Sequence, residues 1–232
     1  FSRGIQVAEN LAFEQLMPPL IDRIQILAYQ QSGYCFGFHG AALERSSNGT
    51  LEHLLIPGAS GAGKSTLTAT LAASGYQVYS DEIIAINKDR QLTRLRLPIA
   101  LKAGSWPAIA RLFPTIDSQT EWRRIDGRRL KYLWPDDSFD HNDNNTPNDR
   151  ASASVRRIVI PSFKSGARPA LRPLSTIETI QLMTRGGYQL GVELSAKRVE
   201  ELIGFCESAK AYQMSYSHSP EALDHLSQLD EQ

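Results

Sequence analysis

The sequence predicts an α/β domain built on a phosphate-binding loop (P-loop), with a mixed sheet and flanking helices. Residues 56–67 read I-P-G-A-S-G-A-G-K-S-T-L and contain the pattern G-x-x-x-x-G-K-[ST]. An apolar run at 51–56 precedes the loop, and a segment with helical spacing at 65–74 follows it and ends at Gly75. Strands and helices alternate only in part, and a hairpin leads into the loop, which favours a mixed sheet over a purely parallel one.

The loop defines the expected nucleotide site. Its glycines let backbone N–H groups turn toward a polyphosphate, and the following helix N-terminus adds partial positive charge. Lys64 can reach the β and γ phosphates, and the Ser65 hydroxyl can ligate Mg²⁺. A chance glycine-rich turn is the alternative, and the strand–loop–helix context argues against it. We expect the polyphosphate of a nucleotide, with Mg²⁺, to be bound by Gly58, Ala59, Ser60, Gly61, Ala62, Gly63, Lys64, Ser65 and Thr66.

The remaining elements are expected within a single domain, residues 1–232. Residues 1–33 are interpreted as an irregular helical lead-in, interrupted by Pro18 and Pro19. Residues 135–154 are polar, acidic and rich in Asn, which predicts a surface loop insertion. Strands are expected at 34–43, 51–56, 77–86, 127–134 and 155–161, with a helix-like stretch at 107–113.

Three helices near the end of the sequence have recognisable start signals. Ser175 and Glu178 form an S-x-x-E capping box, and Ser195 precedes K-R-V-E-E-L-I-G-F-C. Ser219 is followed by Pro at the first helical position of a terminal helix.

Composition narrows the class of protein. The 25 Lys and Arg residues balance 25 Asp and Glu, so no global field attracts nucleic acid or anionic lipid. Cys35 and Cys206 sit in apolar contexts without metal-type spacing, which indicates buried thiols in a reducing compartment. No apolar run approaches a membrane span, and no basic-then-apolar leader is visible. We expect a cytoplasmic protein with no nucleic-acid or membrane partner, and the sequence leaves a homo-oligomer open.

Asp81 and Glu82 interrupt the strand expected at 77–86, soon after the P-loop helix. Neighbouring residues on a strand face opposite ways, so one carboxylate can point into the phosphate site while the other meets the metal or the wall. One would accept the proton of an attacking hydroxyl and the other would bind Mg²⁺. A polar strand edge is the structural alternative. Common P-loop ATPases and GTPases instead carry the magnesium acid on a distant strand.

His39 and several basic residues complete the candidate set. His39 lies in F-H-G-A-A-L, on the strand that leads into the hairpin. A lone His is more often structural than catalytic, but the small residues 40–42 permit close approach of backbone or ligand. Phosphoryl transfer also needs cations around the migrating group. The candidates, each with a solvated surface charge as its alternative, are Lys102, which we prefer, Arg157, Arg124 and Arg156.

Residues 39–82 resemble the catalytic domain of HPr kinase/phosphorylase. The shared features are a strand carrying His-Gly, a hairpin, a loop of the form G-x-S-G-x-G-K-S, one helix ending in Gly and an acidic pair. The chain is more similar to the shorter HPr-kinase-related serine kinases, some of which modify ribosomal peptides, including lasso-peptide precursors. The resemblance extends more weakly through 97–106, 156–161 and 174–180. It implies a fold related to phosphoenolpyruvate carboxykinase.

The resemblance also implies an activity and roles for the site residues. The activity would be Mg-ATP-dependent phosphorylation of a Ser or Thr hydroxyl on a protein or peptide. Asp81 would be the base, Glu82 an auxiliary metal or positioning acid, and His39 a neighbour of the transferred phosphate. The family usually has Asp-Asp where this chain has Asp-Glu, and its Glu-Ile-Arg-Gly-type segment is not found here. The sequence therefore gives no support for the reverse, phosphorylase activity.

Two other functional classes stay open at this point. A nucleotide-binding regulator would keep the P-loop without transferring phosphate, and a small-molecule hydroxyl kinase would share all of the loop chemistry. A peptide kinase should have a wide, open acceptor cleft, whereas a metabolite kinase should have a closed cleft lined with polar groups. Plain ATP hydrolysis is a weaker option, because a kinase should exclude water from its site. The acceptor itself is not identified by the sequence.

Overall fold

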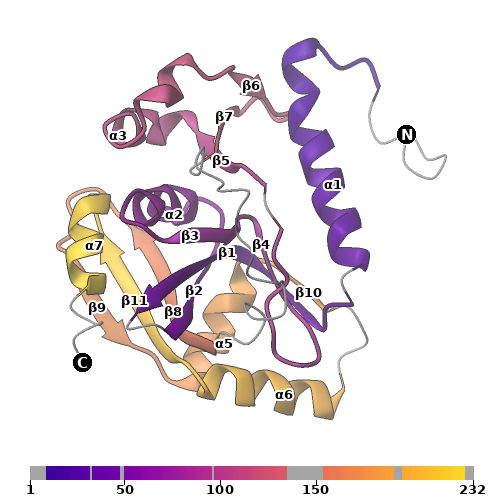
Figure 1. Ribbon diagram of the computed structural model, residues 1–232, viewed down its shortest axis with the longest axis vertical. Helices are drawn as coiled ribbons and strands as arrows, with labels where there is room; N and C mark the ends of the chain where they lie inside the picture. The colour runs from indigo at the N-terminus through magenta and orange to yellow at the C-terminus, as the bar shows by residue number, and fades with distance from the viewer. Residues whose placement is uncertain are drawn as a thin grey trace.

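The computed structural model describes residues 9–31, 33–47, 50–95, 97–134, 154–190 and 195–227. A mixed sheet forms the centre of this part of the chain, with helices on both of its faces (Figure 1). The strands run in the order β10-β1-β2-β8-β11-β9, and β3 and β4 also pair with β1. Their bounds are β1 Phe36–Ser47, β2 Thr50–Pro57, β3 Gln77–Ser80, β4 Ile83–Ile86, β8 Ser154–Phe163, β9 Ala170–Pro173, β10 Tyr188–Leu190 and β11 Lys210–Tyr216. The predicted class, α/β with a mixed sheet and flanking helices, is confirmed.

Strand direction changes across the sheet. β1 and β2 form the predicted antiparallel hairpin, while β2 runs parallel to β8 and β8 runs parallel to β11. The ends of β2, β8 and β11 therefore lie at the same edge of the sheet, which is the edge where the P-loop begins.

Both neighbours of β1 change partway along this strand. Residues 36–38 pair with β10, and from Gly40 onward the same side of β1 pairs with β2. On its other side, residues 36–39 pair with β4, whereas residues 42–44 pair with β3. The P-loop begins at the end of β2, next to the point where the partner of β1 changes from β10 to β2. Asp81 and Glu82 connect β3 to β4, next to the point where the partner on the other side changes. The topology thus brings two distant sequence segments to the same level of one strand.

Two helical layers cover the sheet. The helices α2 (Lys64–Ala73) and α7 (Ser219–Ser227) bury Leu67, Leu71 and Leu226 against one face. The helices α5 (Thr176–Arg185) and α6 (Ala196–Glu207) pack against the other face, where Met183, Leu202 and Phe205 join the core. Successive residues of a strand point to opposite faces of the sheet. The apolar residues of the central strands therefore contribute alternately to the two cores, one under each helical layer.

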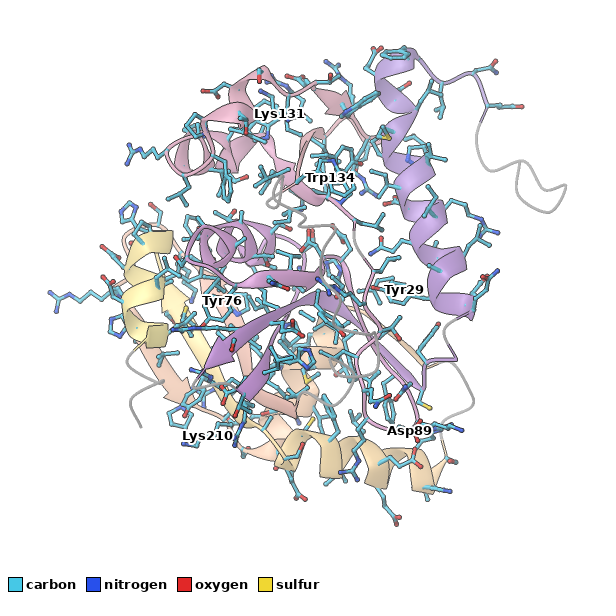
Figure 2. All side chains as sticks on the ribbon, viewed as in Figure 1. Tyr29, Tyr76, Asp89, Lys131, Trp134 and Lys210 are labelled. Carbon is cyan, nitrogen blue, oxygen red and sulfur yellow. The ribbon has the colours of Figure 1, made fainter. Side chains whose placement is uncertain are left out.

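A small subdomain covers the P-loop side (Figure 1). Its three-stranded sheet has the order β5-β7-β6 and carries short helices around a core that includes Ile99, Leu101 and Ile116. Figure 2 labels Lys131 and Trp134 on this part of the chain. The elements are β5 Ile99–Lys102, η2 Ala103–Ser105, α3 Trp106–Ile109, η3 Pro114–Ser118, β6 Trp122–Arg123 and β7 Arg129–Leu133.

The lead-in segment contains a short 3-10 turn, η1 (Phe13–Gln15), and a continuous helix, α1 (Met17–Gln31). The expected interruption at Pro18 and Pro19 is wrong, because both prolines lie in the first turn of α1. There the missing backbone N–H groups have no intrahelical partner to lose. Figure 1 shows α1 running beside the small subdomain at one end and beside β10 at the other.

Most of the other predicted elements agree with the structure. α2 ends before Gly75, and the capping interactions of Ser175 and Ser195 are both formed. The predicted insertion at 135–154 lies outside the described residues except for Ser154, which begins β8. Among the described helices, none combines the length and the apolar composition that a membrane crossing requires.

Candidate functional site

His39 lies at the centre of the site because the strand neighbours change beside it. Its backbone N–H donates to the Gly187 carbonyl at 3.0 Å, and its carbonyl accepts from the Gly58 N–H at 3.1 Å. The next N–H along β1, that of Gly40, donates to the Glu82 carbonyl at 3.0 Å. One short stretch of β1 is therefore hydrogen-bonded both to the start of the P-loop and to the acidic pair.

The P-loop is held by close contacts on two sides. Gly63 has a φ of 94°, and a Cβ at this position would collide with the Tyr216 hydroxyl, which donates to the Gly63 carbonyl at 3.1 Å. Gly186, just beyond α5, lies so close that its Cβ would be 2.5 Å from the Gly58 carbonyl oxygen. Glycine is required at both positions, since any side chain would displace the loop. Gly186 and Tyr216 were not identified from the sequence.

The Lys64 side chain is buried and points at His39. Its Nζ donates to the Ala59 carbonyl at 3.0 Å and lies 3.0 Å from His39 Nε2. Burial, and then the Lys64 charge, lower the pKa of His39, so the imidazole is neutral at neutral pH. Nε2 then accepts from the Lys64 ammonium, and the Nδ1–H donates to the Glu82 carbonyl at 2.9 Å. His39 thereby links the phosphate-binding lysine to the acidic pair.

Asp81 is fully enclosed next to the first turn of α2. The Ser65 hydroxyl donates to Asp81 Oδ2 at 3.3 Å, and the Ala100 N–H donates to the same oxygen at 3.4 Å. Burial and the neighbouring Glu82 charge raise the pKa of Asp81 to about 7. A cation beside this carboxyl would favour its ionised form.

Glu82 is more open and faces a different partner. It has a φ of 80°, which is unusual for a residue other than glycine, and its Oε2 lies 3.3 Å from His39 Nδ1. The two acids were expected to face opposite ways because of strand alternation. Alternation does not apply here, since residues 81–82 form a bend between β3 and β4. Asp81 turns toward Ser65 and Glu82 toward His39.

α1 is tied directly to the acidic pair. Gln25 Nε2 donates to the Asp81 carbonyl at 2.9 Å, and the Tyr29 hydroxyl donates to the Ile83 carbonyl at 2.6 Å. Figure 2 shows Tyr29 between α1 and the central strands. Both side chains are buried, and they lie one turn apart on one face of the helix. The i, i+4 spacing is visible in the sequence and places the two side chains on one helix face. It does not indicate which segment that face contacts.

A cavity of about 970 Å³, the P-loop cavity, opens over these groups. Lys102 lies in its wall and donates to the Ser60 hydroxyl at 3.0 Å. Three arginines, Arg111, Arg124 and Arg128, add further positive charge. Of the predicted site residues, those lining the cavity are His39, Ser60, Gly61, Gly63, Lys64, Ser65, Thr66, Glu82, Lys102 and Arg124.

Arg157 does not join this cavity. It lies on β8 opposite Leu54, in the middle of β2, and its guanidinium is 3.6 Å from the Glu52 carboxylate. Glu52 also lies 3.4 Å from Arg156. The P-loop follows the other end of β2, after Pro57, so the strand itself separates both arginines from the loop.

A second cavity of about 390 Å³, the α1 cavity, lies on the other side of His39 and Glu82. One wall is a face of α1 and the other is formed by the early part of β1 and by Ile83. The two cavities share His39, Glu82 and Arg124. The residues lining the α1 cavity are Asp22, Gln25, Ile26, Tyr29, Tyr34, Gly37, Phe38, His39, Glu82, Ile83, Arg124 and Gly187.

The residues of the P-loop cavity fit a magnesium-bound nucleoside triphosphate. Buried Lys64 and the N-terminus of α2 provide positive charge for phosphates. The Ser65 hydroxyl and the Asp81 carboxylate offer adjacent oxygen atoms, the kind of ligand that Mg²⁺ prefers. Within the described ranges, no group of three or more His, Cys, Asp or Glu forms a metal site by itself.

These features define an α/β domain with a P-loop and an adjoining acidic pair. No protein-family model matches the chain, and no curated protein matches it. Among the solved structures that match is the Hpr(Ser) kinase/phosphatase from Coxiella burnetii. The alignment covers 84% of this chain and 98% of that chain, with 11% sequence identity and a TM-score of 0.29. A TM-score this low does not define a shared fold, so functional inference depends on the geometry of the site.

Proposed function

We propose that this chain is a kinase that transfers the γ-phosphate of Mg-ATP to a Ser or Thr hydroxyl of a protein or peptide. The observation that carries the proposal is the junction at His39, whose ring contacts the P-loop lysine on one side and Glu82 on the other, while the adjacent Asp81 accepts from Ser65 of the loop. A nucleotide regulator needs the loop, but it has no need for a carboxylate exposed at the phosphate end of the cavity. The resemblance of residues 39–82 to HPr-kinase-related serine kinases agrees with this proposal.

Two observations favour exchanging the roles that the resemblance implied for the acids. Asp81 is 3% exposed, lines neither cavity and accepts from Ser65, so it is suited to orient that hydroxyl toward Mg²⁺ and to contact the ion through water. Glu82 lines both cavities and lies beside His39, so an incoming hydroxyl can reach it. Reach is the first requirement for a general base, ahead of pKa. We therefore assign the base role to Glu82.

The transfer step then proceeds with this chain's residues as follows. The acceptor hydroxyl oxygen attacks the γ-phosphorus, the bond from that phosphorus to the bridging oxygen of ADP breaks, and the hydroxyl proton passes to Glu82. The neutral His39 holds the Lys64 ammonium on one side and the Glu82 segment on the other, which fixes both relative to the phosphates. Bound Mg²⁺ would neutralise developing charge on the phosphate oxygens. The cationic wall around Lys102 and Arg128 adds to that stabilisation.

A pair of isosteric variants tests this assignment. Glu82→Gln should keep its affinity for a fluorescent ATP analogue and its magnesium requirement, and lose on the order of 10² to 10⁴-fold in transfer rate. Asp81→Asn should raise the Mg²⁺ concentration needed for half-maximal nucleotide binding. Both are measured with labelled ATP and the products of neighbouring genes as acceptors, alongside analogue titrations. If Glu82→Gln transfers phosphate at the wild-type rate while Asp81→Asn does not, Asp81 is the base, as the resemblance implied.

A further inference from the structure

The α1 cavity has no role in nucleotide binding, yet it ends at the proposed base. His39, Glu82 and Arg124 form the partition between it and the P-loop cavity. A γ-phosphate held near Lys64 would lie on one side of this partition. In-line attack requires the acceptor oxygen to approach the phosphorus from the side opposite the leaving ADP. The α1 cavity adjoins Glu82 from a different side than the P-loop cavity does. An acceptor hydroxyl in the α1 cavity would therefore approach the phosphate from a side other than the P-loop.

One face of α1 supplies the cavity wall. Asp22, Gln25, Ile26 and Tyr29 follow the spacing i, i+3, i+4 and i+7, so their side chains lie on the same face. Gln25 and Tyr29 donate to backbone carbonyls of the segment that carries the acids. The wall and the acids are thus fixed relative to one another. This rigidity suits a surface that has to orient a reacting group.

The charges of the α1 cavity differ from those of the P-loop cavity. Its one lining arginine, Arg124, is already within 3.3 Å of the Asp22 carboxylate, and Glu82 adds a further acid. Three aromatic residues, Tyr29, Tyr34 and Phe38, are also among those lining the cavity, with the rings of Tyr29 and Tyr34 in edge contact at 6.3 Å. An anion would meet two carboxylates here, whereas a cation would meet those carboxylates together with aromatic rings.

We propose that the α1 cavity is the acceptor subsite. It takes a hydroxyl group whose neighbouring groups are apolar, aromatic or cationic, and it rejects acceptors in which those groups are anionic. This inference rests on the proposed kinase function and adds the class of acceptor. The cavity's 390 Å³ accommodates a side chain with its flanking backbone or a small molecule, but not a folded domain. An acceptor serine would therefore be presented on an extended segment.

A cavity-filling variant with a matched control on the same helix tests the location. Ile26→Trp would fill the α1 cavity, while Ile24→Trp adds the same bulk at a more exposed position on α1 that lines neither cavity. The probe is the peptide amide Ala-Ala-Ser-Arg-Ala with labelled ATP, and its binding is followed by fluorescence anisotropy with a non-hydrolysable ATP analogue. Ile26→Trp should lose at least about 10-fold in both peptide binding and transfer. Ile24→Trp should match the wild type, and both variants should keep nucleotide affinity.

The flanking residue tests the chemical class. The same peptide with Tyr or Glu in place of Arg, and free L-serine, are compared as acceptors for the wild type. The Arg and Tyr peptides should exceed the Glu peptide, and Asp22→Asn, which releases Arg124 from its carboxylate, should shift the ratio toward the Glu peptide by about 5-fold. This variant adds no bulk, so the prediction survives if Ile26→Trp fails to fold. Transfer to free serine alone would make the acceptor a metabolite instead of an extended segment.

The outcomes separate the two proposals. If the wild type phosphorylates a peptide and Ile26→Trp does so equally well, the acceptor subsite lies elsewhere and the kinase proposal stands. If the Glu peptide is the best acceptor, the charge argument is overturned. If the wild type binds the ATP analogue and phosphorylates neither the probes nor the products of neighbouring genes, the kinase proposal fails and this inference fails with it.

Discussion

The two cavities share three residues, but they are built in different ways. The P-loop cavity takes its phosphate-binding groups from consecutive residues of a single loop and is ringed by Lys102, Arg111, Arg124 and Arg128. The α1 cavity assembles its walls from a helix and a strand that are separate in the sequence, and acids and aromatic rings line it. The difference shows how one site can hold a polyanion and a hydroxyl side by side: the cations are concentrated on one side of His39 and Glu82.

Lys64→Ala should have the largest effect on the P-loop cavity and provides a test of whether the two cavities are separate in function. Lys64→Ala removes the buried ammonium that bonds to the Ala59 carbonyl and to His39, so both the phosphate charge and the position of His39 are disturbed. We expect phosphate transfer to fall by roughly 10³-fold. Affinity for the fluorescent ATP analogue should fall as well, as measured by titration. Peptide binding in the α1 cavity should fall less than nucleotide binding, because only its His39 wall is disturbed, and an equal loss of peptide binding would show that the two cavities are not separate in function.

An intermediate effect is expected where α5 meets the loop. Gly186→Ala brings a Cβ to 2.5 Å from the Gly58 carbonyl oxygen, so the loop or the end of α5 must move. We expect a loss of about 1–3 kcal/mol in the free energy of unfolding, measured by urea denaturation, together with weaker nucleotide binding. Gly104→Ala is the matched control, since no atom lies within 4 Å of its added Cβ. A stable Gly186→Ala protein with normal nucleotide affinity would contradict the close packing described for the loop.

The smallest expected effect separates two of the four basic residues selected from the sequence, Lys102 and Arg157. Lys102→Ala removes an exposed cation that donates to Ser60 in the P-loop cavity, and should raise the KM for ATP by about 3-fold to 10-fold. Arg157→Ala alters the pairing with Glu52 on the far side of β2 and should leave the KM unchanged. Steady-state kinetics on both variants would sharpen the boundary of the cavity. A larger effect for Arg157→Ala would place the phosphate site nearer to β8 than the geometry indicates.

Features that depend on neighbouring residues could be predicted from the sequence. The P-loop, the β1–β2 hairpin, the Ser175 capping box and the break at Asp81-Glu82 each have a local chemical cause. Features that depend on which distant segments meet could not. The i, i+4 spacing of Gln25 and Tyr29 puts them on one face of a helix, but only the tertiary fold buries that face and sets it against the carbonyls of Asp81 and Ile83.

Two particular residues show the same limit. Lys102 and Arg157 both came from segments with a weak family resemblance, and the sequence favoured Lys102 without indicating where either side chain lies. The register of β8 against β2 sets Arg157 beside Leu54 in the middle of β2, whereas Lys102 ends β5 beside the loop. Strand direction is set by the global topology and has no local signature.

The change of partners along β1 has a consequence for how such a site can evolve. The nucleotide half of the site depends on β2, β3 and α2, and the other half depends on β4, β10 and α1. Residues 39–41 of β1 form the joint that connects the two halves. Substitutions at Asp22 and Ile26 of α1 can therefore accumulate without disturbing the phosphate-binding groups, whereas Gln25 and Tyr29 are constrained by their bonds to the segment that carries the acids. Lineages that inherit the same loop could diverge in what they modify through these two positions of α1. The joint itself should tolerate neither insertion nor deletion, because a shift of one residue would turn His39 to the opposite face of the sheet.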